Sequence, residues 1–229
     1  RTGRRVLIST HTINLQEQLL QHDLPAAAAL VETLEGLEPG TLRASTLKGR
    51  ANYLCLERWS LRRHDPRPRT LAEARLHGRI ATWLPGTTTG DVSELYMSSD
   101  ERGEWAALSA GDSDCLSRRC EYVRDGSCFL LQARQRATSA HAVVVNHALL
   151  LAAASSDSGA LPPFDQLVID EAHRLEEVAT SQYGGTLSMR ELRGFLDDLA
   201  APEGVGGRMQ RAAAFDQAPL SPAAGLVAQ

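Results

Sequence analysis

Two adjacent carboxylates, Asp170 and Glu171, directly follow the apolar run Leu167-Val168-Ile169. A short apolar run of this kind is typical of a strand, which places the two acids at a strand end. There, one carboxylate can hold the Mg²⁺ that bridges the phosphates of a nucleotide, and the next can orient or deprotonate the attacking water. We therefore expect Asp170 to bind Mg²⁺, Glu171 to position the water, and ATP to be the nucleotide. An ordinary strand followed by an acidic helix start would show the same residues.

His173 completes the sequence Asp-Glu-Ala-His that begins at Asp170. We expect this histidine to lie with Asp170 and Glu171 at the nucleotide and to couple that site to another part of the enzyme. A histidine that only caps a helix or packs against it is the alternative.

The chain contains no Gly-x-x-x-x-Gly-Lys-Ser/Thr loop, whose lysine and backbone N–H groups would hold the phosphates. Its only lysine, Lys48, lies in Leu47-Lys48-Gly49-Arg50, which does not fit such a loop. The sequence also begins at Arg1 rather than at a methionine. We therefore interpret it as an internal piece of a longer ATPase, without the phosphate-binding (Walker A) loop and without a second motor domain.

All four cysteines lie in one stretch of irregular sequence or at its edges: Cys55, Cys115, Cys120 and Cys128. Disulfides are disfavoured in the cytosol, so four thiols gathered in this way suggest a metal site. Zinc sites usually contain closely spaced cysteine pairs, and only Cys115 and Cys120 approach that spacing. An iron–sulfur cluster tolerates looser spacing, because each thiolate binds a different iron. The spacing favours a cluster, while structural zinc and unbound thiols remain alternatives.

Charge and hydropathy restrict the class of protein. The formal net charge is −4 over 229 residues, yet arginines are concentrated between Arg43 and Arg79. Such a basic block suggests a surface that faces phosphates, and a solvated helix face would look the same. No apolar run approaches the roughly 18 residues of a membrane span, and no signal peptide is visible. We therefore expect a soluble, cytoplasmic protein with no membrane partner.

Strand-like and helical segments alternate on both sides of an irregular stretch over residues 52–128. The expected strands are 5–10, 44–47, 142–145 and 167–170, and the expected helices are 12–20, 25–37, 71–84, 129–138, 148–154 and 176–199. Alternation of this kind predicts an α/β fold with a doubly wound parallel sheet, and the irregular stretch is interpreted as an insertion. We expect Gln16 and Gln18 on the surface of the first helix, and Tyr53 and the three tryptophans in packing positions.

Five segments, in the same order, resemble the iron–sulfur superfamily 2 DNA helicases of the DinG/XPD type, and the DinG-like branch most closely. They are Ser9–Leu19 (motif Ia), Leu47–Cys55 (entry to the cluster domain), the three later cysteines, Val143–Leu150 (return to the motor domain) and Asp170–His173 (motif II, the DEAH box). Together they extend from Val6 to about Glu177, three-quarters of the chain.

The resemblance implies a partial RecA-like P-loop NTPase sheet with an inserted iron–sulfur cluster domain and the start of a helical arch. The expected boundaries are motor domain 1 over 1–50, the cluster domain over 51–130, motor domain 1 again over 131–186, and the arch or a disordered tail over 187–229. The four cysteines would hold a 4Fe–4S cluster. The implied activity is ATP-driven movement along single-stranded DNA, usually 5′ to 3′, with unwinding of duplex and forked DNA in repair or replication, in a nucleoid-associated protein.

Residues expected to contact DNA lie at strand ends or close to the first cysteine. They are Ser9, Thr10, His11, Lys48, Arg50 and Asn146. A strand that opens into a helix start presents free N–H groups to phosphates, and the carboxyl edge of an α/β sheet is where ligands bind. Two alternatives to an active helicase remain: a zinc-stabilised nucleic-acid-binding module with a non-functional ATPase site, and a nuclease-linked or inactive relative on the same scaffold.

Overall fold

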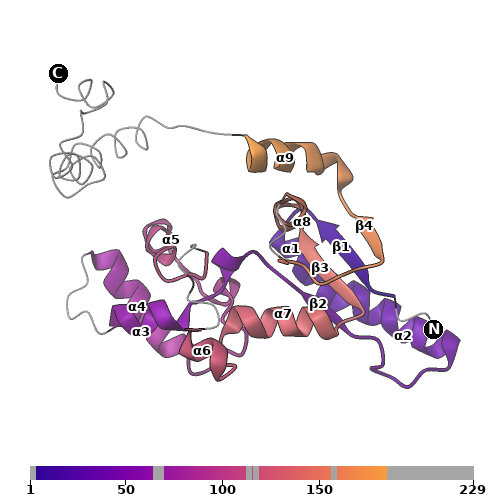
Figure 1. The fold of residues 1–229 in the computed structure, drawn as a ribbon, viewed down its shortest axis with the longest axis horizontal. Coiled ribbons are helices and arrows are strands. Elements are labelled where there is room, and N and C mark those ends of the chain that lie inside the picture. The colour runs from indigo at the N-terminus through magenta and orange to yellow at the C-terminus, as the bar shows by residue number, and fades with distance from the viewer. Residues whose placement is uncertain (1–3, 64–69, 112–114, 116–118, 156–158, 185–229) are drawn as a thin grey trace, which may run out of the picture. The chain divides into compact units, whose positions relative to one another are not determined.

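The computed structural model describes residues 4–63, 70–111, 115, 119–155 and 159–184 (Figure 1). The chain divides into two compact units, Arg1–Gln182 and Tyr183–Gln229. Nearly all described residues belong to the first unit. The expected start of the arch over 187–229, and the part of the last expected helix beyond residue 184, lie outside the described residues.

Four parallel strands form one sheet in the order β2-β3-β1-β4 (Figure 1). They are β1 (Val6–Thr10), β2 (Ala44–Thr46), β3 (Ala142–Asn146) and β4 (Gln166–Ile169). Each strand lies within one residue of its expected bounds, because each is a short apolar or β-branched run. The predicted α/β class, a partial RecA-like fold with a parallel sheet, is confirmed.

The central strand β1 pairs with β3 on one side and β4 on the other, with Ser9 opposite both Val145 and Ile169. β4 therefore forms one edge of the sheet. Its three apolar side chains are all exposed: Leu167 is 42% exposed, Val168 49% and Ile169 36%.

Helices of the α/β part follow the strands, as the alternation predicts. They are α1 (Ile13–Gln18), the π-helical η1 (Leu19–Asp23), α2 (Leu24–Glu35), α7 (Phe129–Ser139), α8 (His147–Ala154), the 3-10 helix η5 (Ala172–Arg174) and α9 (Leu175–Tyr183). Thr12 caps α1, and its hydroxyl oxygen accepts a hydrogen bond from the Leu15 N–H at 3.2 Å. No helix among the described residues is both long enough and apolar enough to cross a membrane.

The expected surface position of Gln16 is wrong, because this residue is completely buried. The helix α1 packs against β3, so one of its faces must be buried whatever residue type it carries. In the described part of the chain, neither Oε1 nor Nε2 of Gln16 has a hydrogen-bond partner. Gln18, two residues further on, is exposed as expected.

The insertion consists of short helices and loops. The elements are the 3-10 helices η2 (Arg50–Asn52) and η3 (Val92–Glu94), and the α-helices α3 (Leu56–Arg63), α4 (Leu71–Trp83), α5 (Ser99–Trp105) and α6 (Glu121–Arg124). Its apolar core is continuous with that of the sheet, since Tyr53, Trp59 and Trp105 belong to the same buried cluster as Leu7 and Val143. The predicted packing role of the aromatic residues is confirmed, with Trp83 partly buried against the same core.

Gly90 lies where a helix of the α/β part meets a loop of the insertion. Its φ is +62°, and a Cβ added there would lie 2.2 Å from ring carbons of Phe129, the first residue of α7. Its carbonyl oxygen also accepts a hydrogen bond from the Leu54 N–H at 2.9 Å. Only glycine fits this close approach.

Replacing Gly90 by alanine is expected to destabilise the fold by about 3 kcal/mol or more, from left-handed backbone strain plus overpacking against Phe129. The matched control is Gly36→Ala, since Gly36 has a φ of +63° but nothing within 4 Å of the added Cβ. That variant should lose only about 1–2 kcal/mol. Chemical denaturation of the two variants measures the difference, and equal losses would contradict the close contact.

Candidate nucleotide and nucleic-acid site

The carboxyl ends of β1, β3 and β4 meet at one edge of the sheet. The strand register places Thr10 directly opposite Asn146, and Asp170 follows the last residue of β4. Ser9, Thr10, Asn146 and Asp170, which the sequence nominates separately, are therefore brought together. This edge is where open α/β sheets bind their ligands.

Asp170 is held in place by the neighbouring strand. The Thr10 hydroxyl donates to Asp170 Oδ2 at 3.1 Å, and the Asp170 N–H donates to the Ser9 carbonyl oxygen at 2.8 Å. Thr10 is completely buried and Asp170 is half-buried, so this contact is partly shielded from solvent. The carboxylate expected to bind Mg²⁺ is thus oriented by β1 rather than by its own strand alone.

Glu171 turns the chain sharply after β4. It is the one non-glycine residue among those described with a positive φ, +52°. A non-glycine residue in this conformation costs on the order of 1–3 kcal/mol and is often found at functional sites. Its Oε2 lies 3.4 Å from Nε2 of His173, and both side chains are open to solvent. Glu171 and His173 therefore face each other at the surface, while their roles in ATP hydrolysis remain predictions.

A buried pair joins the ends of β1 and β3. The Ser9 hydroxyl lies 2.7 Å from Nδ1 of His147, and both residues are completely buried. Burial lowers the pKa of His147 below its ordinary value of 6.5, and the nearby His11 lowers it further. Burial thus favours the neutral ring, although the nearby Glu171 and Asp170 raise the pKa in the opposite direction, and Nδ1 is paired with Ser9.

The hydroxyl groups of Ser9 and Thr10 are thus internal, on His147 and Asp170. The DNA contacts expected of these two residues stay predictions. His11 is only partly buried, with its ring centroid 6.2 Å from that of His147. The sequence analysis gave no reason to pair His147 with Ser9, which is 138 residues away.

A hollow of about 570 Å³ lies beside the ends of β2 and β3, and Arg50, Arg134 and Asn146 are among the residues that line it. Asn146 also caps α8, because its side-chain oxygen accepts from the Leu149 N–H at 2.9 Å. The sequence analysis missed Arg134. Arg134 lies four residues after Leu130, which lines the same hollow. Residues at this spacing share one face of a helix, and this was the sequence signal that could have placed Arg134 beside Leu130. The hollow combines positive charge with an amide, as a phosphate-binding groove would.

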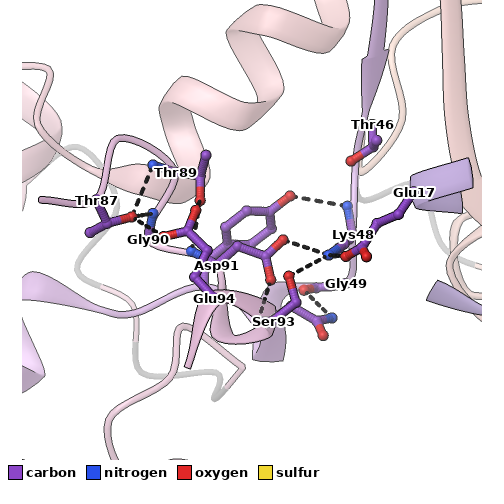
Figure 2. A network of polar contacts seen from close by, with 12 residues as sticks. Glu17, Thr46, Lys48, Gly49, Thr87, Thr89, Gly90, Asp91, Ser93 and Glu94 are labelled. Carbon is purple, nitrogen blue, oxygen red and sulfur yellow. Dashed lines mark hydrogen bonds and ion pairs between the residues drawn. The ribbon is translucent and has the colours of Figure 1, made fainter. Parts of the chain in front are cut away.

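Lys48 is directed toward the carboxylates of Asp91 and Glu17 (Figure 2). Its Nζ lies 2.7 Å from Oδ2 of Asp91 and 3.4 Å from Oε1 of Glu17, and its side chain is only 4% exposed. The sequence nominated Lys48 for DNA contact. This contact stays a prediction, and it would require the ammonium group to leave these partners.

All four cysteines line one small cavity of about 50 Å³ in the insertion, together with apolar residues such as Leu54 and Val123. Burial raises the pKa of the Cys128 thiol, and the neighbouring Cys55 and Cys120 raise it further. Within the described ranges, no group of three or more His, Cys, Asp or Glu side chains is placed to hold a single metal ion. The donor set, four thiols around one hollow, is chemically suited to an iron–sulfur cluster, whose thiolates each bind a separate iron.

Comparison with known proteins gives a consistent result. The chain is 33% identical over 206 residues to the ATP-dependent DNA helicase YoaA of Escherichia coli, which is 87% of this chain and 30% of that protein. It is 35% identical over 201 residues to the ATP-dependent helicase DinG of Mycobacterium tuberculosis, 82% of this chain and 29% of that protein. It is also 33% identical over 195 residues to the 3′-5′ exonuclease DinG of Bacillus subtilis, 84% of this chain and 19% of that protein.

The chain is related to the DinG-like helicases. The resemblance deduced from its five segments is confirmed at this level, over most of its length. It spans about 30% of the length of the helicases that it matches. No protein-family model matches the chain.

Ser9→Ala tests the buried pair. Removing the hydroxyl leaves Nδ1 of His147 buried without its partner, which should lower the free energy of unfolding by about 1–3 kcal/mol. Ser155→Ala is the control, because the Ser155 hydroxyl is exposed and donates only to the Ala152 carbonyl oxygen of its own helix. It should change stability by less than about 0.5 kcal/mol. Urea titration of both variants supplies the comparison, and a Ser9→Ala protein as stable as the control would refute the pairing.

Proposed function

We propose that this chain forms part of an ATP-dependent DNA helicase that moves along single-stranded DNA and unwinds duplexes. The observation that carries the proposal is the contact between Thr10 and Asp170. It ties the acidic motif of the nucleotide site to β1, the strand that leads into the expected DNA-contacting segment. The names of the YoaA and DinG relatives support the same activity.

At the nucleotide end, Asp170 would hold Mg²⁺, Glu171 would orient the attacking water, and His173 would link this site to the second motor domain. Bound Mg²⁺ supplies charge neutralisation for the phosphates of ATP. The left-handed conformation of Glu171 and its open carboxylate suit a residue that must reach a water molecule outside the strand. The phosphate-binding loop would come from sequence beyond this chain.

At the DNA end, we propose that His11, Arg50 and Asn146 contact the backbone of single-stranded DNA, with Ser9 and Thr10 placing the segment that carries His11. Arginine side chains position nucleic acid through its phosphates without reading its sequence. The substrates would be single-stranded and forked DNA, with movement from 5′ to 3′, in repair or replication. The corresponding location is the cytoplasm, in association with the nucleoid.

We further propose that residues 51–130 form a 4Fe–4S domain held by Cys55, Cys115, Cys120 and Cys128, inserted between the two parts of motor domain 1 at 1–50 and 131–186. Residues 187–229 would begin the helical arch. The insertion has only two isolated β-bridges among its described residues, so metal–thiolate bonds would add substantially to its folding energy.

Two other functions remain as outcomes of experiment. A zinc-stabilised nucleic-acid-binding module would bind DNA but not hydrolyse ATP. A nuclease-linked relative is suggested by the printed name of the Bacillus subtilis protein, of which this chain covers 19%. Metal analysis of anaerobically purified protein separates a cluster from zinc, and an exonuclease assay on the full-length protein tests the other function.

Glu171→Gln in the full-length protein should leave ATP binding intact and reduce turnover by about 10²–10⁴-fold, the usual contribution of a general base. The amide keeps the size of the side chain but cannot accept a proton. Glu176→Gln serves as the control, since this acid lies in the first turn of α9. Steady-state ATP hydrolysis gives the result, and unchanged turnover in Glu171→Gln would remove its assigned role.

Cys128→Ser should lose iron, sulfide and visible absorption together with unwinding. Cys128 is the N-cap residue of α7, and serine is favoured at that position, so the helix itself should survive. Ser127→Ala should keep its full iron content, because the Ser127 hydroxyl donates to Asp125 and the residue does not line the cysteine cavity. Full iron in Cys128→Ser would exclude this cysteine as a ligand.

A further inference from the structure

The only lysine of the chain connects the sheet to the insertion. One residue, Leu47, separates Lys48 from the end of β2. Leu47 extends the sheet, because its N–H donates to the Val144 carbonyl oxygen at 2.9 Å. The ammonium group then crosses to the insertion, where Asp91 Oδ2 lies at 2.7 Å and Ser93 Oγ at 3.0 Å (Figure 2). A charged group from one part is thus enclosed by acceptors of the other.

A second acid approaches from the opposite side. Glu17 belongs to α1, the helix that directly follows β1, and its Oε1 lies 3.4 Å from Nζ of Lys48. Glu17 is much more open than Asp91, with 42% against 13% of the side chain exposed. Asp91 is therefore the stronger partner, because solvent screens the charge of Glu17. Lys48 links α1 to the loop that contains Asp91.

The backbone of Lys48 is also connected to Asp91, through Tyr53. Its N–H donates to the Tyr53 hydroxyl oxygen at 3.0 Å, and Tyr53 forms an antiparallel bridge with Asp91. Asp91 in turn accepts from the Ser93 N–H at 2.9 Å. Backbone and side chain of Lys48 thus reach the same few residues, which leaves the ammonium group little freedom to turn away.

Glu94 extends the network to α4. Its carboxylate accepts hydrogen bonds from the Thr87 hydroxyl at 2.6 Å, from the Thr89 hydroxyl, and from Nε1 of Trp83, the last residue of α4, at 2.8 Å. Burial raises the pKa of Glu94, but these three hydrogen bonds outweigh it and hold the pKa below the ordinary value of 4.5. The loop over 85–94 is thereby held by hydrogen bonds within itself and to the end of α4. Figure 2 shows Thr87, Thr89 and Glu94 of this loop near Asp91.

We propose that Lys48, Asp91 and Glu17 form an ionic joint that transmits displacement of α1 to the insertion. The inference rests on the proposed function, in which α1 follows the DNA-contacting segment and the insertion belongs to the same unwinding enzyme. Lys48 is then a positioning residue, and its ammonium group serves the joint instead of a DNA phosphate. A buried pair suits this purpose, since its main effect is to fix one arrangement rather than to add net stability.

The first experiment measures base pairs unwound per ATP hydrolysed by the full-length protein. Asp91→Asn should keep DNA-independent ATP hydrolysis and lower this ratio by about fivefold or more, the smallest effect typical of coupled sites. Asp100→Asn is the matched control: an exposed aspartate of the same insertion, in the first turn of α5. An unchanged ratio in Asp91→Asn would overturn the joint.

A second experiment requires neither DNA nor helicase activity. Lys48→Met, Asp91→Asn and the double variant form a double-mutant cycle for urea unfolding of the full-length protein. The joint predicts that the double variant loses less stability than the sum of the single losses. Lys48→Met leaves the Asp91 carboxylate without its cation, and Asp91→Asn leaves the Lys48 ammonium group with only the more exposed Glu17. Additive losses would overturn the joint whatever the unwinding assays show.

DNA binding separates the joint from the direct contact first expected of Lys48. The joint predicts that Lys48→Met and Asp91→Asn bind a single-stranded oligonucleotide with the same salt dependence as the parent. A salt slope reduced by about one in Lys48→Met alone would identify a phosphate contact and overturn the joint. If the full-length parent unwinds nothing, the proposed function fails, and the double-mutant cycle then decides the ionic pairing by itself.

Discussion

The parallel pairing of β1 with β3 and β4 is the constraint on which the rest of the molecule depends. It brings together residues far apart in the sequence: Ser9 and His147 are 138 positions apart, and Thr10 and Asp170 are 160 apart. Since parallel strands end at the same edge, three strand ends deliver their polar residues to one place. Closing such long loops is costly in entropy, and the buried valines of β3 are part of what offsets that cost.

The insertion does not form a separate hydrophobic core beside this sheet. One continuous apolar core includes residues of both parts, and Gly90 allows the ring of Phe129 to approach the loop of the insertion closely. The polar network around Lys48 fixes the position of the insertion relative to the sheet. Hydrogen bonds and ion pairs have a defined geometry, whereas apolar contacts alone would allow the two parts to slide. In the proposed helicase, a rigid connection of this kind would allow a conformational change at the nucleotide site to be transmitted to the insertion.

Much of this fold follows from local sequence patterns. Short apolar runs fixed the strands to within a residue, and Thr12 and Asn146 act as caps because their side chains compete well for free N–H groups. The partners of the polar residues did not follow. Gln16 is buried because of where its helix packs, and Asp91 lies in an irregular loop whose path no periodicity encodes. The four cysteines line one cavity, as their gathering in one stretch of sequence suggested, while the cluster that their spacing favours stays a prediction.

The open edge at β4 affects how the protein behaves at high concentration. In the part of the chain that the structure describes, β4 pairs on one side only, and its apolar residues Leu167, Val168 and Ile169 are exposed. An edge of this kind is a template on which another strand can add, either from further sequence of the same protein or from another molecule. Natural edge strands avoid the second outcome with proline, lysine or a bulge, and the sequence Gln-Leu-Val-Ile of β4 has neither proline nor lysine. For work with this chain alone we therefore expect dilute samples or a solubilising fusion to limit association through β4.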